Sequence, residues 1–292
     1  MVDFETIDKL YFIAEIGINH NGDIQIAKKL IDASFGSSWE CVKFQKRNPD
    51  VCVPEHQKGV MRDTPWGRMT YLEYKHRVEF GKKEYDFINE YCKQKPIDWT
   101  ASVWDLDSVD FMSNYDVPFI KIPSAMLTND ELLEAAIATK KHIILSTGMS
   151  SLDEIDHAVQ ILKSGDVYYR EKDYHHASFT LLHCNSTYPA PDNELNLRVI
   201  QTLKDRYYCP VGYSGHERDL EAPLLAIVLG ARVIERHITL SHNMWGTDHK
   251  SSLEVHAMDM LKKRSEKVLP MMGSSEKIIM SSEKEIRKKL RG

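Results

Sequence analysis

The sequence predicts a closed parallel (β/α)8 barrel, the TIM-barrel class, built as a single domain over residues 1–292. Eight short β-prone runs follow one another along the chain, and a helical pattern comes after each of them. Such alternation is typical of a parallel sheet, and 292 residues suit a barrel that usually needs about 250. Polar side chains also recur where the β-prone runs end, which is the rim where barrel enzymes form their sites.

The composition is that of an ordinary globular protein and argues against several classes of function. Hydrophobic residues make up 42% and charged residues 28% of the chain, which is enough for a sizeable core. A formal net charge of −5 argues against a surface for nucleic acid or anionic membrane. The apolar run at 222–231 is too short to cross a bilayer.

The N-terminus and the cysteines indicate a reduced, cytoplasmic protein. Residues 1–6 lack the basic segment and apolar run of a secretory signal. The five cysteines are odd in number, scattered and free of CxxC spacing.

The first β-prone run spans residues 11–16 and leads through a turn-rich stretch at 17–22 into a helix that begins near Asp23. The second run spans 41–45 and contains Lys43. A buried parallel strand is usually apolar throughout, so this lysine requires an explanation. The predicted inner face of the first helix carries Ile24, Ala27, Leu30, Ile31 and Ser34.

Residues 46–71 contain three prolines and two glycines and show no sustained period. A segment of that length in a compact domain is usually a binding loop or a lid, so we predict a long active-site loop. A helix over residues 72–95 is predicted next, with Val78, Tyr85, Ile88 and Tyr91 as core contacts.

The remaining units alternate regularly. Ser151 and Glu154 have the spacing of a helix capping box. Apolar residues at 220, 224, 225, 227 and 228 predict a helix between the last two β-prone runs, which end in His216 and His237. From Ser275 the lysine-rich tail is a final helix or, as we favour, a solvated end. The other predicted runs are 98–103, 119–122, 143–147 and 179–184, with helices over 106–114, 129–139 and 195–206.

Polar residues stand at the carboxyl end of every predicted strand. Lysines inside barrel strands need an anion or a shifted pKa, so Lys43 and Lys121 indicate function more strongly than a single buried serine does. In chain order the rim carries Glu15, Lys43, Gln45, Ser102, Lys121, Ser124, Ser146, Asn185, Ser186, Ser214, His216, Glu235 and His237.

These residue types favour two kinds of site. Two lysines, several hydroxyls and the backbone NH groups of the turns at 17–22 and Gly148 suit a phosphate. His216 and His237, beside Glu235 and Asp248, suit a divalent metal that keeps positions for water or substrate. One of the two histidines could instead be a core residue bonded to a carboxylate.

The chain resembles the sialic acid synthase (N-acetylneuraminate synthase) family over about residues 10–270. The motifs that carry this resemblance are AEIGINHNG at 14–22, VKFQ at 42–45, IKIPS at 120–124, LSTGM at 145–149, HC at 183–184, YPAP at 188–191, GYSGH at 212–216, ERH at 235–237 and GTDH at 246–249.

The resemblance implies a transferase of carbohydrate biosynthesis that condenses phosphoenolpyruvate with N-acetylmannosamine or a related N-acylated hexose and releases phosphate. His216 and His237 would bind the metal, typically manganese, with magnesium or cobalt as alternatives. Glu15 would handle the water or proton transfer beside Gln45, and Tyr188 and Asp248 would face the sugar. The resemblance also implies a homodimer. The other substrate-binding residues would be Lys43, Ser102, Lys121, Ser124, Ser146, Asn185, Ser186 and Ser214.

Three features depart from the family pattern. Ala125 and Met126 stand where the family commonly has glycine and an acidic residue, and Gly215 replaces an aspartate before His216. The resemblance covers the catalytic barrel without the small antifreeze-like domain that usually follows it in the family and contacts the partner's sugar. Another chain would then supply that contact, or the sugar site is closed differently, or the aldehyde differs.

Two other functions compete with this interpretation. The first is a metal-dependent barrel aldolase or lyase acting on a related keto-acid, including a version with a Schiff base on Lys43 or Lys121. The second is a non-catalytic sugar-phosphate-binding homologue, because a fold alone never proves a reaction.

Overall fold

The computed structural model describes residues 9–165 and 177–291, and its central feature is a closed ring of eight parallel strands. The ring closes because β1 (Tyr11–Gly17) pairs with both β2 (Cys41–Lys46) and β10 (Val233–Thr239). The predicted (β/α)8 barrel is therefore confirmed. Between β2 and β10 the order is β5 (Asp98–Val103), β6 (Phe119–Ile122), β7 (His142–Ser146), β8 (Phe179–Cys184) and β9 (Val211–Gly215).

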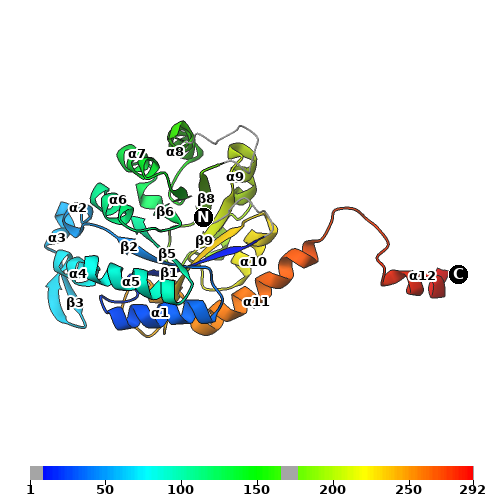
Figure 1. Cartoon of the computed structure of the whole chain (residues 1–292), viewed down its shortest axis with the longest axis horizontal. Coiled ribbons are helices and arrows are strands. Elements are labelled where there is room, and N and C mark those ends of the chain that lie inside the picture. The colour runs from blue at the N-terminus through cyan, green and yellow to red at the C-terminus, as the bar shows by residue number, and fades with distance from the viewer. Residues whose placement is uncertain (1–8, 166–176, 292) are drawn as a thin grey trace.

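Helices surround this ring and bury its outer surface (Figure 1). Several begin where the sequence supplies a cap; Asp23 and Asn129, for example, accept backbone NH groups at the starts of α1 and α7. The predicted Ser151–Glu154 capping box is confirmed at α8. The outer helices are α1 (Ile24–Gly36), α5 (Lys82–Gln94), α6 (Leu106–Ser113), α7 (Asp130–Ala138), α8 (Leu152–Gly165), α9 (Val199–Tyr207), α10 (Glu221–Val228) and α11 (Val255–Met272).

The barrel interior has an apolar layer below a polar one. The apolar layer is Ile13, Cys41, Phe119, Ile144, Leu182 and Val233, all of which are buried. Because side chains alternate along a strand, the residue two positions further on faces the same way. The alternation of side chains along each strand therefore places a second set of residues together at the rim, and most of them are polar. Two positions after the apolar layer these residues are Glu15, Lys43, Lys121, Ser146, Cys184 and Glu235.

The segment 46–71 is more regular than predicted. It contains α2 (Pro49–Cys52), α3 (Glu55–Lys58) and an antiparallel hairpin of β3 (Met61–Thr64) and β4 (Gly67–Thr70). The predicted long loop thus contains short helices and strands that the sequence did not reveal, because each is too short to leave a period.

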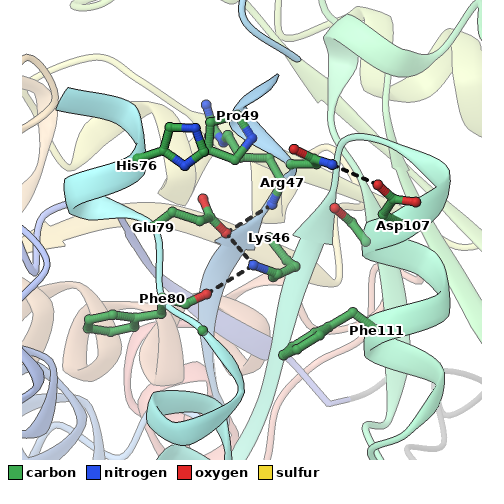
Figure 2. A pocket seen from close by; sticks show the side chains of 11 residues that line it. Lys46, Arg47, Pro49, His76, Glu79, Phe80, Asp107 and Phe111 are labelled. Carbon is green, nitrogen blue, oxygen red and sulfur yellow. Dashed lines mark hydrogen bonds and ion pairs between the residues drawn. The ribbon is translucent and has the colours of Figure 1, made fainter. Parts of the chain in front are cut away.

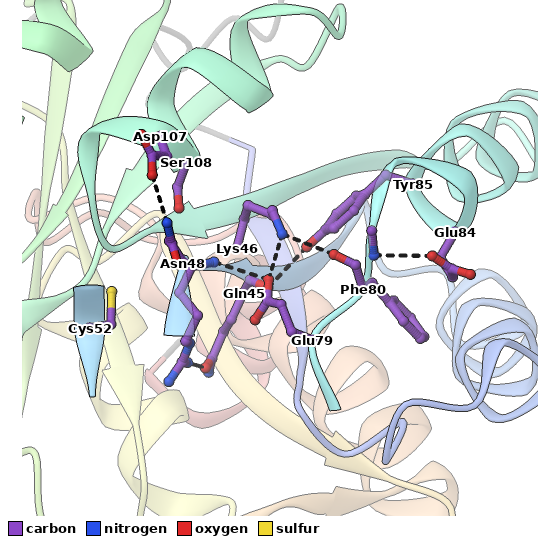
Figure 3. A network of polar contacts seen from close by, with 12 residues as sticks. Gln45, Lys46, Asn48, Cys52, Glu79, Phe80, Glu84, Tyr85, Asp107 and Ser108 are labelled. Carbon is purple, nitrogen blue, oxygen red and sulfur yellow. Dashed lines mark hydrogen bonds and ion pairs between the residues drawn. The ribbon is translucent and has the colours of Figure 1, made fainter. Parts of the chain in front are cut away.

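The predicted helix over 72–95 is in fact two helices, α4 (Tyr71–Val78) and α5. The break holds Glu79 and Phe80, and Lys46 donates to the Glu79 carboxylate at 2.8 Å and the Phe80 carbonyl at 2.9 Å (Figure 3). Glu84 accepts the Gly81 NH at 3.0 Å and starts the second helix. Val78 and Tyr85 are seven residues apart, so the apolar period runs across the break and hides it.

Two further element predictions need correction. The helix predicted from residue 195 begins at Val199, after the 3₁₀ turn η3 (Asp192–Glu194). On α10, Leu225 and Val228 are exposed, because Ala222, Pro223, Ala226 and Ile227 form the buried face instead.

After β10 the chain forms η4 (His249–Ser251) and β11 (Leu253–Glu254), which extends β10 in parallel, and then α11. The tail ends in α12 (Glu283–Arg291), which stands apart from the barrel in Figure 1 and is exposed along its length. The tail, for which a final helix or a solvated end was predicted, thus contains a helix that is exposed to solvent. In the described ranges, no helix is long and apolar enough to cross a membrane.

Candidate active site

Lys43 is the centre of the polar layer. Its ammonium nitrogen lies 2.5 Å from Glu15 Oε2, donates to Ser102 Oγ at 2.7 Å and lies 3.7 Å from Glu235 Oε1. Burial alone would lower the pKa of Lys43, but the two carboxylates outweigh it and raise that pKa. Lys43 therefore carries a positive charge that is held in place within the buried polar layer.

Lys121 is the second buried ammonium group. It donates to Ser146 Oγ at 2.7 Å and lies 3.8 Å from Glu235 Oε1. Burial lowers the pKa of Lys121, against the opposing charge of Glu235. Burial would raise the pKa of Glu235, but Lys121 and Lys43 hold it down at about 2. Ser214 Oγ donates to the same Glu235 oxygen at 3.1 Å.

Beyond the lysines, hydroxyl and NH groups converge around Gly148. The Gly148 NH donates to Ser124 Oγ at 3.0 Å, and Ser124 Oγ lies 3.1 Å from Cys184 Sγ. A Cβ on Gly148 would lie 2.4 Å from Ser186 Oγ and 2.9 Å from Ser124 Oγ. Any side chain at position 148 would therefore fill the space between these hydroxyl groups. Glycine keeps that space free, and a site for phosphate oxygens requires it.

The two predicted metal-binding histidines lie side by side at the rim, with ring centroids 5.6 Å apart. His216 Nδ1 lies 2.5 Å from the Asn185 carbonyl oxygen, which can only accept, so this nitrogen carries the proton. His216 Nε2 then accepts from the Tyr188 hydroxyl at 2.9 Å. Burial, and then the neighbouring His237, lower the pKa of His216 to about 3, so its imidazole is neutral.

This arrangement fits a divalent cation held by two imidazoles. A backbone carbonyl on Nδ1 is a common way of turning the Nε2 lone pair toward a metal. His237 Nδ1 and Glu235 Oε2 are buried and have no hydrogen-bond partner among the described residues. Within the same ranges no set of three His, Cys, Asp or Glu side chains is arranged as a metal site, so water or substrate would complete the coordination.

Glu15 lies on β1, between the strand of Lys43 and the strand of His237, and Gln45 of β2 contacts it. Gln45 Nε2 donates to Glu15 Oε1 at 2.9 Å. A Cβ on Gly17 would lie 3.1 Å from both side chains and 3.4 Å from His237 Cε1, so the backbone passes close to all three. In the barrel register Glu15 pairs with Lys43 on one side and His237 on the other.

Asp248 and Asn185 lie at the edge of the site. Asp248 is half-buried after β10, and its charge contributes to raising the pKa of both Tyr188 and Tyr74, after burial in each case. The Asn185 side chain bonds within its own loop, to Thr187 NH and the Glu194 carbonyl, so its contribution to the site is the backbone carbonyl.

Sequence reasoning missed the carboxylate beside Gly215. A Cβ there would lie 2.7 Å from both Glu217 oxygens. Glu217 accepts from Arg236 at 2.6 Å and from the Tyr213 hydroxyl at 2.7 Å, all of them buried. The carboxylate of Glu217 therefore occupies the space into which a side chain at position 215 would project, a relationship that only the folded chain reveals.

A pocket of about 360 Å³ lies next to the rim. The polar rim residues described above, such as Lys43 and Glu15, do not line it. Lys46 and Arg47 line it together with His76, Glu79 and Asp107 (Figure 2). Arg47 also donates to Gln45 Oε1, which connects this region to Glu15. The sequence placed Arg47 only in a long loop and gave no reason to single it out.

Comparison with known proteins shows the family to which this chain belongs. The NeuB family model matches residues 30–277, so the chain belongs to the NeuB family. It is 37% identical to the N,N'-diacetyllegionaminic acid synthase of Campylobacter jejuni over 94% of this chain and 81% of that protein. It is 35% identical to the N-acetylneuraminate-9-phosphate synthase of Drosophila melanogaster over 89% of this chain and 68% of that one.

A solved structure has the same fold. The N-acetylneuraminic acid synthetase of Leptospira borgpetersenii, in complex with citrate, superposes with a TM-score of 0.84 and 32% identity, covering 98% of this chain and 93% of that one. The proteins that match this chain include synthases of sialic, legionaminic and pseudaminic acids, and the sequence-based family assignment is confirmed.

Proposed function

We propose that this protein condenses phosphoenolpyruvate with an open-chain N-acylated hexose, such as N-acetylmannosamine or a relative, and releases phosphate. The observation that supports this most is the rim itself, where two buried ammonium groups, a ring of hydroxyls, Glu15 and two imidazoles meet. The free cysteines are consistent with a reducing, cytoplasmic setting, and we expect a homodimer.

In this proposal the lysines hold the phosphorylated substrate. Phosphoenolpyruvate carries a carboxylate and a phosphate, and Lys43 and Lys121 offer one buried positive charge to each region. The hydroxyls of Ser124 and Ser186, which lie close to the Gly148 backbone, would bind the phosphate oxygens. These contacts fix C3 of the enol beside the aldehyde, which removes orientational freedom before reaction.

The reaction forms a bond between C3 of phosphoenolpyruvate and the aldehyde carbon of the sugar, whose oxygen takes up a proton. Water adds at C2, the bond between C2 and the phosphate oxygen breaks, and inorganic phosphate leaves. In this proposal Glu15 would accept the proton of that water, and the hydrogen bond from Gln45 would orient its carboxylate. His216 and His237 would hold the divalent metal, expected to be manganese, which supplies Lewis acidity to the carbonyl.

Phosphate release with single components omitted tests this proposal. We expect phosphate only when phosphoenolpyruvate, a divalent cation and an N-acylated hexose are all present. Binding of phosphoenolpyruvate without turnover on any aldehyde would instead favour the non-catalytic function. A lysine adduct trapped by borohydride with a keto-acid would favour the aldolase.

A further inference from the structure

A buried ion pair lies behind the two histidines, on the outer side of the barrel wall. Arg236 Nη1 lies 2.6 Å from Glu217 Oε1, and the two side chains are 0% and 1% exposed. Because side chains alternate along a strand, Arg236 faces the surrounding helices, whereas Glu235 and His237 face the barrel interior with Val233. Any effect of this pair on the rim must therefore act through the residues that it contacts.

The acceptors that the structure gives Arg236 all belong to the loop that follows His216. They are Glu217 Oε1 at 2.6 Å, the Asp219 carbonyl at 2.9 Å and the Glu217 carbonyl. Residues 217–219 form no backbone-to-backbone hydrogen bond within the described ranges. The planar guanidinium, with its several donors, is thus the main polar support of this loop.

The Glu217 carboxylate also joins the two strands that carry the histidines. Its Oε2 accepts from the Tyr213 hydroxyl of β9 at 2.7 Å, while its Oε1 accepts from Arg236 of β10. His216 directly follows β9, and His237 lies on β10 beside the arginine. One carboxylate therefore bridges both strands just behind the two imidazoles.

The glycine at position 215 makes room for this bridge. Gly215 pairs with Arg236 in the parallel register of β9 and β10. A Cβ on Gly215 would lie 2.7 Å from both Glu217 oxygens and 2.8 Å from Tyr213 Cε1. The space beside the guanidinium is thus open, and a carboxylate from two positions further along the chain fills it.

The His216 side chain is fixed from two sides. The segment after β8 holds one side, because His216 Nδ1 lies 2.5 Å from the Asn185 carbonyl oxygen and the His216 carbonyl accepts the Ala190 NH at 3.2 Å. The other side is the peptide bond to Glu217, whose loop is held by the arginine. A shift of that loop would move the His216 ring relative to His237, whose ring centroid lies 5.6 Å away.

We propose that Arg236 and Glu217 are positioning residues that hold His216 and His237 at the separation that a shared divalent cation requires. This inference rests on the proposed function, because it concerns the cation expected for the condensation. Groups that orient metal ligands without touching the metal typically contribute about 10- to 100-fold to metal affinity. A buried ion pair suits this role, since it fixes geometry more than it adds net stability.

The affinity of the protein for Mn²⁺, measured from the electron paramagnetic resonance signal of the free ion, tests this inference. Arg236→Lys keeps the charge but replaces the fork by one nitrogen, and Glu217→Gln keeps the size but removes the ion pair. We expect each variant to raise the Kd for Mn²⁺ about 10- to 100-fold. Glu217→Ala should do the same, and adding Gly215→Asp to it should lower the Kd again, because position 215 pairs with Arg236.

Glu79→Gln is the matched control, because it neutralises the carboxylate of another largely buried ion pair, formed with Lys46. It should lower the temperature of thermal unfolding but leave the Kd for Mn²⁺ unchanged. Thermal unfolding of each variant identifies those that fold, and Arg236→Lys decides the test if Glu217→Gln does not fold.

A wild-type Kd for the folded Arg236→Lys and Glu217→Gln variants, or equal effects of Glu217→Gln and Glu79→Gln on that Kd, would overturn this inference and leave the condensation intact. Failure of the wild type to bind Mn²⁺ would overturn the metal-dependent condensation as well.

Discussion

The ammonium nitrogen of Lys43 lies 2.5 Å from Glu15 Oε2, and both side chains are only 2% exposed. A buried ion pair of this kind adds little net stability, because desolvation offsets most of the attraction, but it fixes two charges at a defined separation. In the proposed reaction, that separation would put the proton acceptor Glu15 beside the substrate-binding cation Lys43.

The first prediction concerns Glu15. Glu15→Gln keeps the size of the side chain but removes the proton acceptor, so the rate of phosphate release should fall about 10²- to 10⁴-fold. Steady-state kinetics and urea unfolding would be measured together. Glu79→Gln, which breaks the similar Lys46 pair outside the strand-end site, should lower stability without that loss of rate. Equal rates for Glu15→Gln and the wild type would remove Glu15 from the mechanism.

The second prediction concerns phosphoenolpyruvate binding at Gly148. Gly148→Ala would place a methyl group 2.4 Å from Ser186 Oγ, so KM for phosphoenolpyruvate should rise at least about tenfold, or about 1.4 kcal/mol. Gly59→Ala is the control, since no heavy atom lies within 4 Å of its Cβ position. An unchanged KM for Gly148→Ala would place the phosphate elsewhere.

The third prediction concerns Gly215. Gly215→Asp would force a second carboxylate against Glu217, whose oxygens lie 2.7 Å from the new Cβ, and should destabilise the fold by about 1–3 kcal/mol through overpacking. Adding Glu217→Ala should recover part of this loss, because the new aspartate can then approach Arg236. Thermal unfolding of both variants checks the expectation. Wild-type stability of Gly215→Asp would show that Glu217 does not occupy this space.

The fourth prediction concerns acid stability through His20. This imidazole is buried and stacks on Phe80 at 3.8 Å, and burial lowers its pKa to about 3 from an ordinary 6.5. The unfolded chain therefore binds a proton that the folded chain rejects, so stability falls as pH drops from about 6.5 toward 3, by about 1.4 kcal/mol per pH unit.

Urea unfolding between pH 7 and pH 4 measures that slope. His20→Gln should reduce it by about one proton, or about 1.4 kcal/mol per pH unit. The exposed His256 on α11 is the control, and His256→Gln should keep the wild-type slope. A His20→Gln slope that matches the wild type would show that His20 is protonated in the folded state.

The strand-end residues could be predicted because they follow from two local regularities. Side chains alternate along strands, and parallel strands end at one rim, so the amino-acid sequence alone places Lys43 and Lys121 there. The break at Glu79 was not predictable, because the seven-residue spacing of Val78 and Tyr85 imitates a continuous helix. Arg47 and Glu217 were missed for another reason: their roles depend on Gln45, Gly215 and Arg236, which only tertiary folding brings close.

Glu15 and His237 are neighbours where β1 pairs with β10 and closes the ring, although they lie far apart in the sequence. A nascent chain that does not yet include β10 would contain Lys43 and Lys121 but would lack Glu235 and His237, so the proposed site would be incomplete. Recovery of turnover during refolding should therefore follow completion of the ring, later than the appearance of helix.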